Sequence, residues 1–194
     1  MWDTWWPSLR RRPGERLINM TGSEEKHSIY TRIARRALEN NIKGRTRLDI
    51  PEELPPGLTR PGAAFVSLKK KGNLRGCIGT IQPLQENLAA EIAENALGAA
   101  LRDPRFPPVT ATELDELDIS VDVLSDPEKV EDISTLDPRR YGVIVRTGMR
   151  SGLLLPALEG VDTVEQQLEI ARRKANIYDD EPAEIYRFEV KRYY

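Results

Sequence analysis

Two stretches of the sequence repeat the same order of patterns, and this repetition constrains the fold more than any other feature. Each stretch has two short apolar runs joined by a tight turn, then a proline, a helical pattern and a further alternating run. The runs cover residues 63–69 and 74–80 in the first stretch, and residues 141–147 and 152–156 in the second. Short apolar runs separated by a glycine-containing turn are typical of β-hairpins. The sequence therefore predicts two strand-strand-helix-strand repeats.

The remaining elements of the repeats follow from spacing. Each hairpin has two glycines four positions apart, Gly72 with Gly76 and Gly148 with Gly152. One helix is expected from Pro83 onward and one over residues 163–176, with apolar residues at helical spacing. Strands at 118–124 and 185–190 would close the repeats. We expect repeat units at about 63–125 and 140–192, which form two packed lobes of mostly antiparallel sheet flanked by helices, an α+β fold.

The segment before the repeats has a different composition. A T-G-S-E sequence at residues 21–24 offers a capping box for a helix that should end near residues 40–44. Residues 1–22 hold all three tryptophans, followed by three arginines, and lack the apolar stretch of a signal peptide. We expect a poorly ordered tail over residues 1–22 and a single two-lobed domain over residues 23–194. The alternative is a peripheral anchor, with tryptophans at a lipid interface and arginines on acidic headgroups.

Charge and cysteine content exclude several classes of protein. The chain of 194 residues has a formal net charge of -2, so a broad electrostatic grip on nucleic acid is not expected. Its single cysteine, Cys77, cannot form an internal disulfide, and no apolar run approaches the roughly 20 residues of a membrane span. We therefore expect a cytoplasmic protein without a membrane span.

A three-residue turn at 71–73 would fix the register of the first hairpin. Its apolar face would pair Val66 with Ile78 and Leu68 with Gly76. Its other face would pair Phe65 with Gly79, Ser67 with Cys77 and Lys69 with Arg75. That second face would carry two adjacent cations, a hydroxyl and a thiol, with an aromatic ring over a glycine.

The second hairpin shows which of these residues the local fold does not need. It reads S-G-L-L-L where the first reads R-G-C-I-G, so Gly76 has a counterpart and Arg75, Cys77 and Gly79 do not. Adjacent cations require a counter-charge, and a glycine lets a ligand approach closely. We expect an anion-binding or thiol-bearing cleft floor, with ligand-binding residues Ser67, Lys69, Arg75, Gly76, Cys77 and Gly79. The alternative is that a carboxylate from a neighbouring loop neutralises the cations and Cys77 packs as a small apolar residue.

The sequence DPRFPP at residues 103–108 is a second candidate element. Its three prolines end the preceding helix and stiffen the connector to the next strand. Phe106 could anchor this connector in apolar surface. In the functional interpretation, Phe106 and Arg105 form a wall of the cleft, and Arg105 adds to the positive field of Lys69 and Arg75.

These motifs resemble the AMMECR-domain family. The resemblance extends from about residue 29 to residue 188 and rests on LRGCIG, DPRFPP, the segment YGVIVRTGMRSGLLLP and a late RRKA sequence. It implies a two-lobed α+β domain with internal duplication, similar to protein A of AmmeMemoRadiSam gene sets, which acts beside Memo-like and radical-SAM proteins. It implies no defined catalytic mechanism. The chain departs from the family pattern at Asn176, where glycine is more usual, and in its tryptophan-containing N-terminus.

Two functional hypotheses follow for the hairpin. One is a binding or accessory module that holds a small anionic ligand or a partner's group without turnover. The other is an enzyme or modification factor that uses Cys77 as nucleophile, with Arg75 favouring the thiolate. Nucleic-acid binding is a third hypothesis that the charge balance disfavours. One cysteine and one histidine, His27, provide neither an iron-sulfur cluster nor a usual zinc site, so no metal or cofactor is expected.

Overall fold

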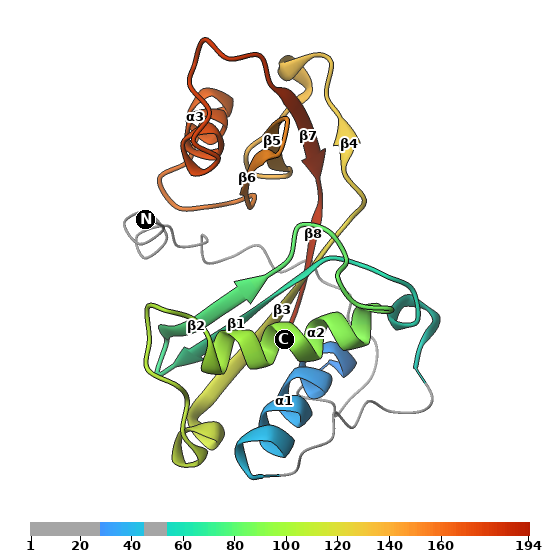
Figure 1. Cartoon of the computed structure of the whole chain (residues 1–194), viewed down its shortest axis with the longest axis vertical. Helices are drawn as coiled ribbons and strands as arrows, with labels where there is room; N and C mark the ends of the chain where they lie inside the picture. Colours follow the sequence, from blue (N-terminus) through green and yellow to red (C-terminus); the bar gives the residue numbers. More distant parts are fainter. Residues whose placement is uncertain (1–27, 45–53) are drawn as a thin grey trace. The chain divides into compact units, whose positions relative to one another are not determined.

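The computed structural model describes residues 28–44 and 54–194, which divide into two compact units. The LRGCIG unit comprises the described residues between 28 and 124 together with Lys191–Tyr194, and the second unit contains Ser125–Val190. The elements, in chain order, are α1 (Ile29–Ile42), η1 (Pro56–Leu58), β1 (Ala64–Lys70), β2 (Asn73–Gly79), α2 (Leu88–Leu101), η2 (Ala111–Glu116), β3 (Leu117–Leu124), β4 (Glu128–Lys129), η3 (Ile133–Thr135), β5 (Gly142–Thr147), β6 (Arg150–Leu154), α3 (Val164–Lys174), β7 (Glu184–Phe188) and β8 (Val190–Tyr193) (Figure 1).

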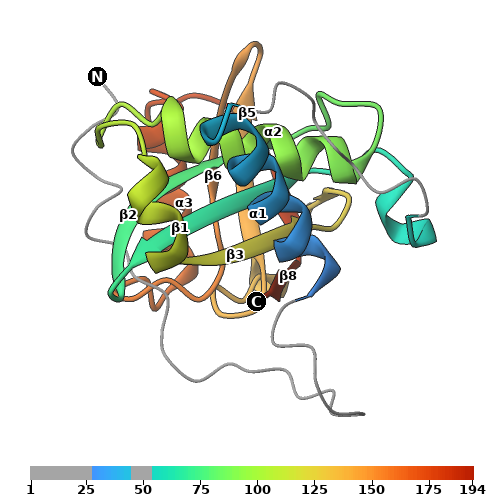
Figure 2. The same cartoon turned by 90° about the horizontal axis from the view of Figure 1, so that it is seen from below.

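The LRGCIG unit is a four-stranded sheet with two helices on one face. Its strands follow the order β2-β1-β3-β8, and the β1–β2 and β1–β3 pairs are antiparallel. Helix α2 packs on β1 and β2, while α1 packs on α2 and β3 (Figure 2). Alternate residues of each strand therefore face the helices, which leaves the other face of the sheet to the polar residues of the hairpin.

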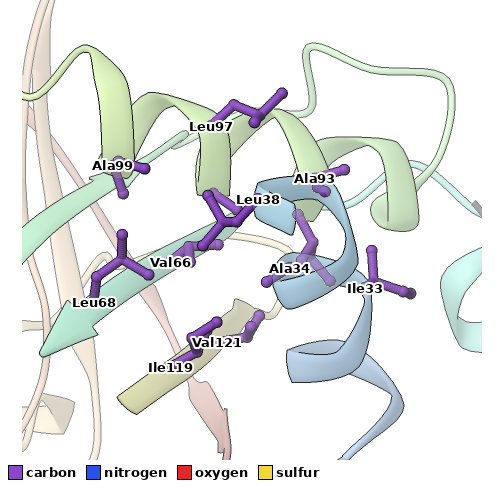
Figure 3. Close-up of a cluster of buried hydrophobic side chains, with 14 of the residues drawn as sticks. Ile33, Ala34, Leu38, Val66, Leu68, Ala93, Leu97, Ala99, Ile119 and Val121 are labelled. Atoms are coloured by element: carbon purple, nitrogen blue, oxygen red, sulfur yellow. The ribbon is translucent and has the colours of Figure 1, made fainter. Parts of the chain in front are cut away.

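Aliphatic side chains fill the space between the helices and the sheet. Leu38 of α1, Leu97 of α2, Val66 of β1 and Val121 of β3 belong to one buried cluster (Figure 3). The helix surface that faces the strands is rich in alanine, so helix and sheet approach closely. At Gly76 of β2 an added Cβ would lie 2.1 Å from the carbonyl oxygen of Ala99, so only glycine fits there.

The second unit repeats this packing with its own elements. Its sheet has the order β4-β7-β5-β6, and α3 packs on β5 and β6. At Gly152 of β6, an added Cβ would lie 2.0 Å from the carbonyl oxygen of Ala171 in α3. Asn176 follows Ala175, the C-cap of α3, and its φ of 54° is left-handed, which explains why glycine suits this position.

The α+β class predicted from the sequence is confirmed, and each unit has the predicted strand-strand-helix-strand order. Internal duplication and the predicted domain bounds stay predictions. The tail predicted over residues 1–22 and the T-G-S-E box lie outside the described residues. In the described part of the chain, no helix is long and apolar enough to cross a bilayer.

Three predicted boundaries are wrong. Helix α1 is capped by Ser28, whose hydroxyl accepts a hydrogen bond from the amide of Thr31, rather than by the earlier box. Helix α2 begins after Asn87, so Leu84 lies in the preceding loop, 74% exposed. The predicted strand at 185–190 splits at Glu189 into β7 of the second unit and β8, which joins the sheet of the LRGCIG unit.

Candidate functional site

The first hairpin has the predicted register over most of its length. Val66 pairs with Ile78, Leu68 with Gly76, Ser67 with Cys77 and Phe65 with Gly79. The predicted pairing of Lys69 with Arg75 is wrong, because a register shift between Leu68 and Lys69 places Lys69 opposite Leu74. Arg75 is therefore not paired with the positive charge of Lys69.

Cys77 lies in the middle of β2 and is buried. Its Sγ accepts a hydrogen bond from the Ser67 hydroxyl on β1, with Oγ and Sγ 3.3 Å apart. Ser120 of β3 stands opposite Ser67, so three small polar side chains form a row across the sheet. Burial raises the pKa of the Cys77 thiol, and this effect outweighs the hydrogen bond from Ser67 and the positive charge of Arg105.

Arg75 is held by a carboxylate that the sequence did not indicate. Its Nε and Nη2 atoms donate to the two carboxylate oxygens of Glu113, each at 3.1 Å, while Nη1 donates to the Pro107 carbonyl at 2.8 Å. Glu113 also accepts from Lys70 and from the amide of Thr110. The hydrogen bond from Arg75 is the largest of the effects that lower the pKa of Glu113 to about 2. For Arg75, the structure therefore agrees with the alternative in which a carboxylate from elsewhere in the chain neutralises the positive charge.

The DPRFPP connector is fastened to β2 through Asp103 and Arg105. Asp103 accepts the backbone N–H of Cys77 at 2.9 Å, and Arg105 donates to the carbonyl of the same residue at 3.2 Å. The two side chains also pair with each other, with Nη2 and Oδ2 2.6 Å apart. Burial raises the pKa of Asp103, but the hydrogen bonds from Arg105 and from the Cys77 amide outweigh it and lower that pKa overall. Phe106 is half-buried, and the Arg105 guanidinium lies 5.5 Å from its ring centre.

Both glycines of the motif have an internal reason. Gly76 makes room for helix α2, and at Gly79 an added Cβ would lie 2.2 Å from the ring of Phe65. The aromatic ring over Gly79 that the sequence predicted is thus present, and it fills the space that was assigned to an approaching ligand.

The structure brings some of the predicted site residues together and separates others. Ser67, Cys77 and Arg105 form one cluster, and the exposed Lys69 lies two residues along β1 on the Ser67 face. Arg75 instead belongs to a cluster with Glu113. The sequence analysis missed Glu113 and Asp103, although a charged residue between a helix end and a run of prolines, as at Asp103, is a detectable signal. Among residues 28–44 and 54–194, no three ligating side chains come together to hold a metal ion.

Comparison with known proteins identifies the family. The family model AMMECR1 matches residues 31–193. A protein of Thermotoga maritima is 54% identical over 167 residues, which cover 84% of this chain and 96% of that protein. The crystal structure of uncharacterized protein PH0010 from Pyrococcus horikoshii superposes with a TM-score of 0.74 at 33% identity, covering 84% of this chain and 88% of that one.

A longer relative contains a similar region within a larger protein. The Clostridium acetobutylicum protein CA_C1420 is 48% identical over 175 residues, which are 88% of this chain but only 36% of that protein. The matched region is therefore joined there to a larger additional segment. With a family model that spans both units and a relative 54% identical over nearly its whole length, the chain belongs to the AMMECR1 family.

Proposed function

We propose that this chain is a binding or accessory module without thiol chemistry, and that its site is the polar face of the LRGCIG hairpin. The observation that carries the proposal is the environment of Cys77. Its thiol is buried, burial raises its pKa, and the nearby Arg75 is bound to Glu113 instead of to the sulfur. A nucleophilic cysteine requires the thiolate near neutral pH and access for a substrate, and these contacts oppose both.

The residues of this face favour a ligand with a single negative charge. Lys69 provides an exposed ammonium, and Ser67 provides a hydroxyl two residues away on the same face. The exposed Asp118 pairs with Lys69 across β1 and β3, so the local charge is nearly balanced. Such a site suits one carboxylate of a small molecule or of a partner protein better than a polyanion such as RNA.

The proposed partners are a Memo-like protein and a radical-SAM enzyme. This part of the proposal rests on the family resemblance and on the Clostridium relative, in which the matched region is 36% of a longer chain. A domain that occurs fused to another segment in one organism is a reasonable candidate to bind a separate protein in another. Titration of a purified Memo-like protein from the same genome, followed by calorimetry, tests this association, and Lys69→Met should weaken it.

Alkylation of Cys77 tests the absence of thiol chemistry. Iodoacetamide should modify the folded protein much more slowly than the urea-unfolded chain at pH 7, with Cys77→Ser as the blank. Fast alkylation well below the ordinary thiol pKa of about 8.5, slowed by Arg75→Ala, would replace the binding module with a thiol-dependent enzyme.

A separate titration tests the ligand class. Acetate, inorganic phosphate and a short single-stranded RNA are titrated into the protein, and amide chemical shifts of β1 are followed by NMR. We expect acetate to shift the Ser67 and Lys69 amides, and Lys69→Met to remove the effect. Lys71→Met is the matched control, because the Lys71 side chain is 80% exposed at the turn and pairs with Glu116. Unchanged spectra with acetate and phosphate would overturn the anionic ligand, and salt-sensitive binding of RNA alone would favour nucleic acid.

A further inference from the structure

Strand β2 is at the edge of its sheet, and its backbone is bonded on the side away from β1. Among the strands of residues 28–44 and 54–194, the order β2-β1-β3-β8 leaves one side of β2 without a neighbouring strand. On that side Asp103 accepts the N–H of Cys77 and Arg105 donates to its carbonyl. In an antiparallel ladder, one residue of an adjacent strand would make both of these bonds.

The two side chains imitate the hydrogen bonds of a paired strand. A carboxylate supplies the acceptor, a guanidinium supplies the donor, and the Asp103–Arg105 ion pair fixes the distance between them. The Asp103 side chain is 1% exposed and that of Arg105 is 14% exposed, so water does not readily displace them. We call this pair the edge plug.

The connector that carries the plug is also fixed along β2. Arg75 of β2 donates to the carbonyls of Pro107 and Pro108, which follow the plug in the chain. Proline has no backbone N–H, so this part of the connector cannot itself extend the sheet by a regular ladder. The backbone of the connector therefore does not pair with the outer edge of β2, and the side chains of Asp103 and Arg105 bind that edge instead.

The sequence of β2 is compatible with pairing to a second copy of itself. An antiparallel pair of β2 strands centred on Cys77 places Arg75 opposite Gly79 and Gly76 opposite Ile78 of the other copy. No like charges face each other, and the apolar and polar faces stay on their own sides of the sheet. An open edge with this sequence is a template for self-association.

We propose that the Asp103–Arg105 edge plug prevents β2 from pairing with β2 of a second copy of this chain. The proposal does not depend on the ligand or partners of the hairpin face. It assigns DPRFPP a role beyond that of a rigid connector, namely control of the assembly state.

Sedimentation of an open-edge variant tests the proposal. Asp103→Ala with Arg105→Ala removes both bonds to Cys77, and we expect the average mass to rise with protein concentration while the wild type stays unchanged. Arg102→Ala with Glu94→Ala is the matched control, because this ion pair is nearby but exposed and makes no bond to β2. Adding Cys77→Pro to the open-edge variant should restore the original mass, since proline lacks the N–H that a second copy would bind.

Two results would overturn the proposal. An open-edge variant that keeps its circular dichroism spectrum and an unchanged mass at millimolar concentration would overturn the proposal. If this variant fails to fold, hydrogen exchange of the wild-type protein provides the test. The Cys77 amide should be protected as strongly as amides inside the β1–β3 ladder, and exchange at the rate of an exposed amide would overturn the plug.

Discussion

Gly76 and Gly152 show how one residue sets the distance between a helix and a sheet. In each unit a helix carbonyl occupies the place of the missing Cβ, at 2.1 Å for Gly76 and 2.0 Å for Gly152. A backbone atom cannot rotate away as a side chain can, so any larger residue must push the whole helix. The glycine shared by the two hairpins is thus a packing requirement and does not point to a ligand.

Gly76→Ala is expected to destabilise the protein by about 2–4 kcal/mol, because the new methyl group collides with the Ala99 carbonyl. Urea unfolding followed by circular dichroism measures the change. Gly57→Ala is the control, since the nearest atom to its added Cβ is the Tyr30 hydroxyl oxygen at an ordinary 3.6 Å. Equal unfolding midpoints for the two variants would contradict the close approach of α2.

The carboxylate of Glu113 should make stability depend on acid pH. Its pKa is lowered from 4.5 to about 2 by hydrogen bonds from Arg75 and Thr110, so the folded state favours the ionised form. This contribution is fully present above about pH 4.5 and is lost as the pH falls toward 2. Glu113→Gln removes it, and the unfolding free energy of the variant should therefore fall less steeply than that of the wild type between these pH values.

Glu116→Gln provides the comparison for this measurement. Glu116 also contacts Lys70 but is 41% exposed, so its loss should leave the pH dependence close to that of the wild type. Parallel curves for wild type and Glu113→Gln would show that the Arg75–Glu113 contact contributes nothing to acid sensitivity.

At the scale of elements, one buried side chain accepts hydrogen bonds from three groups of loop 80–87. Glu91 of α2 is 1% exposed, and it accepts from the amides of Leu84 and Gln85 and from the Thr80 hydroxyl. The Glu91 carboxylate thus holds the chain where it leaves β2 and turns toward α2. Leu84 stays outside the helix because its amide is bonded to this carboxylate.

Glu91→Ala should cost about 2–4 kcal/mol, since three donors lose their acceptor in a buried site. Glu91→Gln should cost much less, because its oxygen can still accept the two amides and its nitrogen can donate to Thr80. Thermal unfolding and hydrogen exchange at Leu84 measure both effects. The same loss in the two variants would mean that the charge matters and the hydrogen-bond pattern does not.

The hairpin illustrates what the sequence could and could not predict. Alternation of apolar and polar residues was enough for four pairs of the β1–β2 register, because a one-residue slip would expose the whole apolar face. No comparable pattern in the sequence marks the register shift between Leu68 and Lys69. The contact of Arg75 with Glu113 spans 38 positions and depends on how η2 returns to the hairpin, which spacing along the chain does not encode.

The last strand shows a second limit of the same kind. The segment 185–190 alternates continuously, and nothing in its sequence marks Glu189 as the point where the chain leaves one sheet and enters another. The split depends on Ser125, which is distant in sequence: the N–H of Glu189 donates to the Ser125 hydroxyl, and the N–H of Ser125 donates to the Glu189 carbonyl. Cys77 lies on a strand, as the alternation predicted, but its contact with Asp103 and the contact of Arg75 with Glu113 became clear only when tertiary contacts were known.

At the scale of the whole molecule, the chain passes between the two units at two places in the described residues. It leaves the LRGCIG unit after Leu124 and returns at Lys191. The last four residues thus complete a sheet that begins more than a hundred positions earlier. Arg192 of β8 binds Asp122 of β3 through two bonds of 2.6 and 2.5 Å, and Tyr193 stacks on Tyr30 at 3.7 Å.

Arg192→Met is expected to destabilise the LRGCIG unit by about 3–5 kcal/mol, because Asp122 is only 2% exposed and would keep a buried charge without its counter-ion. The double variant Asp122→Val with Arg192→Met should recover most of this loss, since no charge is then left buried.

Hydrogen exchange of the full chain locates the effect of Arg192→Met. Protection of Val66 in β1 and Val121 in β3 should fall, while Val143 and Val145 in β5 should keep theirs, as Arg192 makes its ion pair within the LRGCIG unit. An equal fall in both units would show instead that the two unfold as one cooperative block, and that the C-terminal strand stabilises the whole molecule.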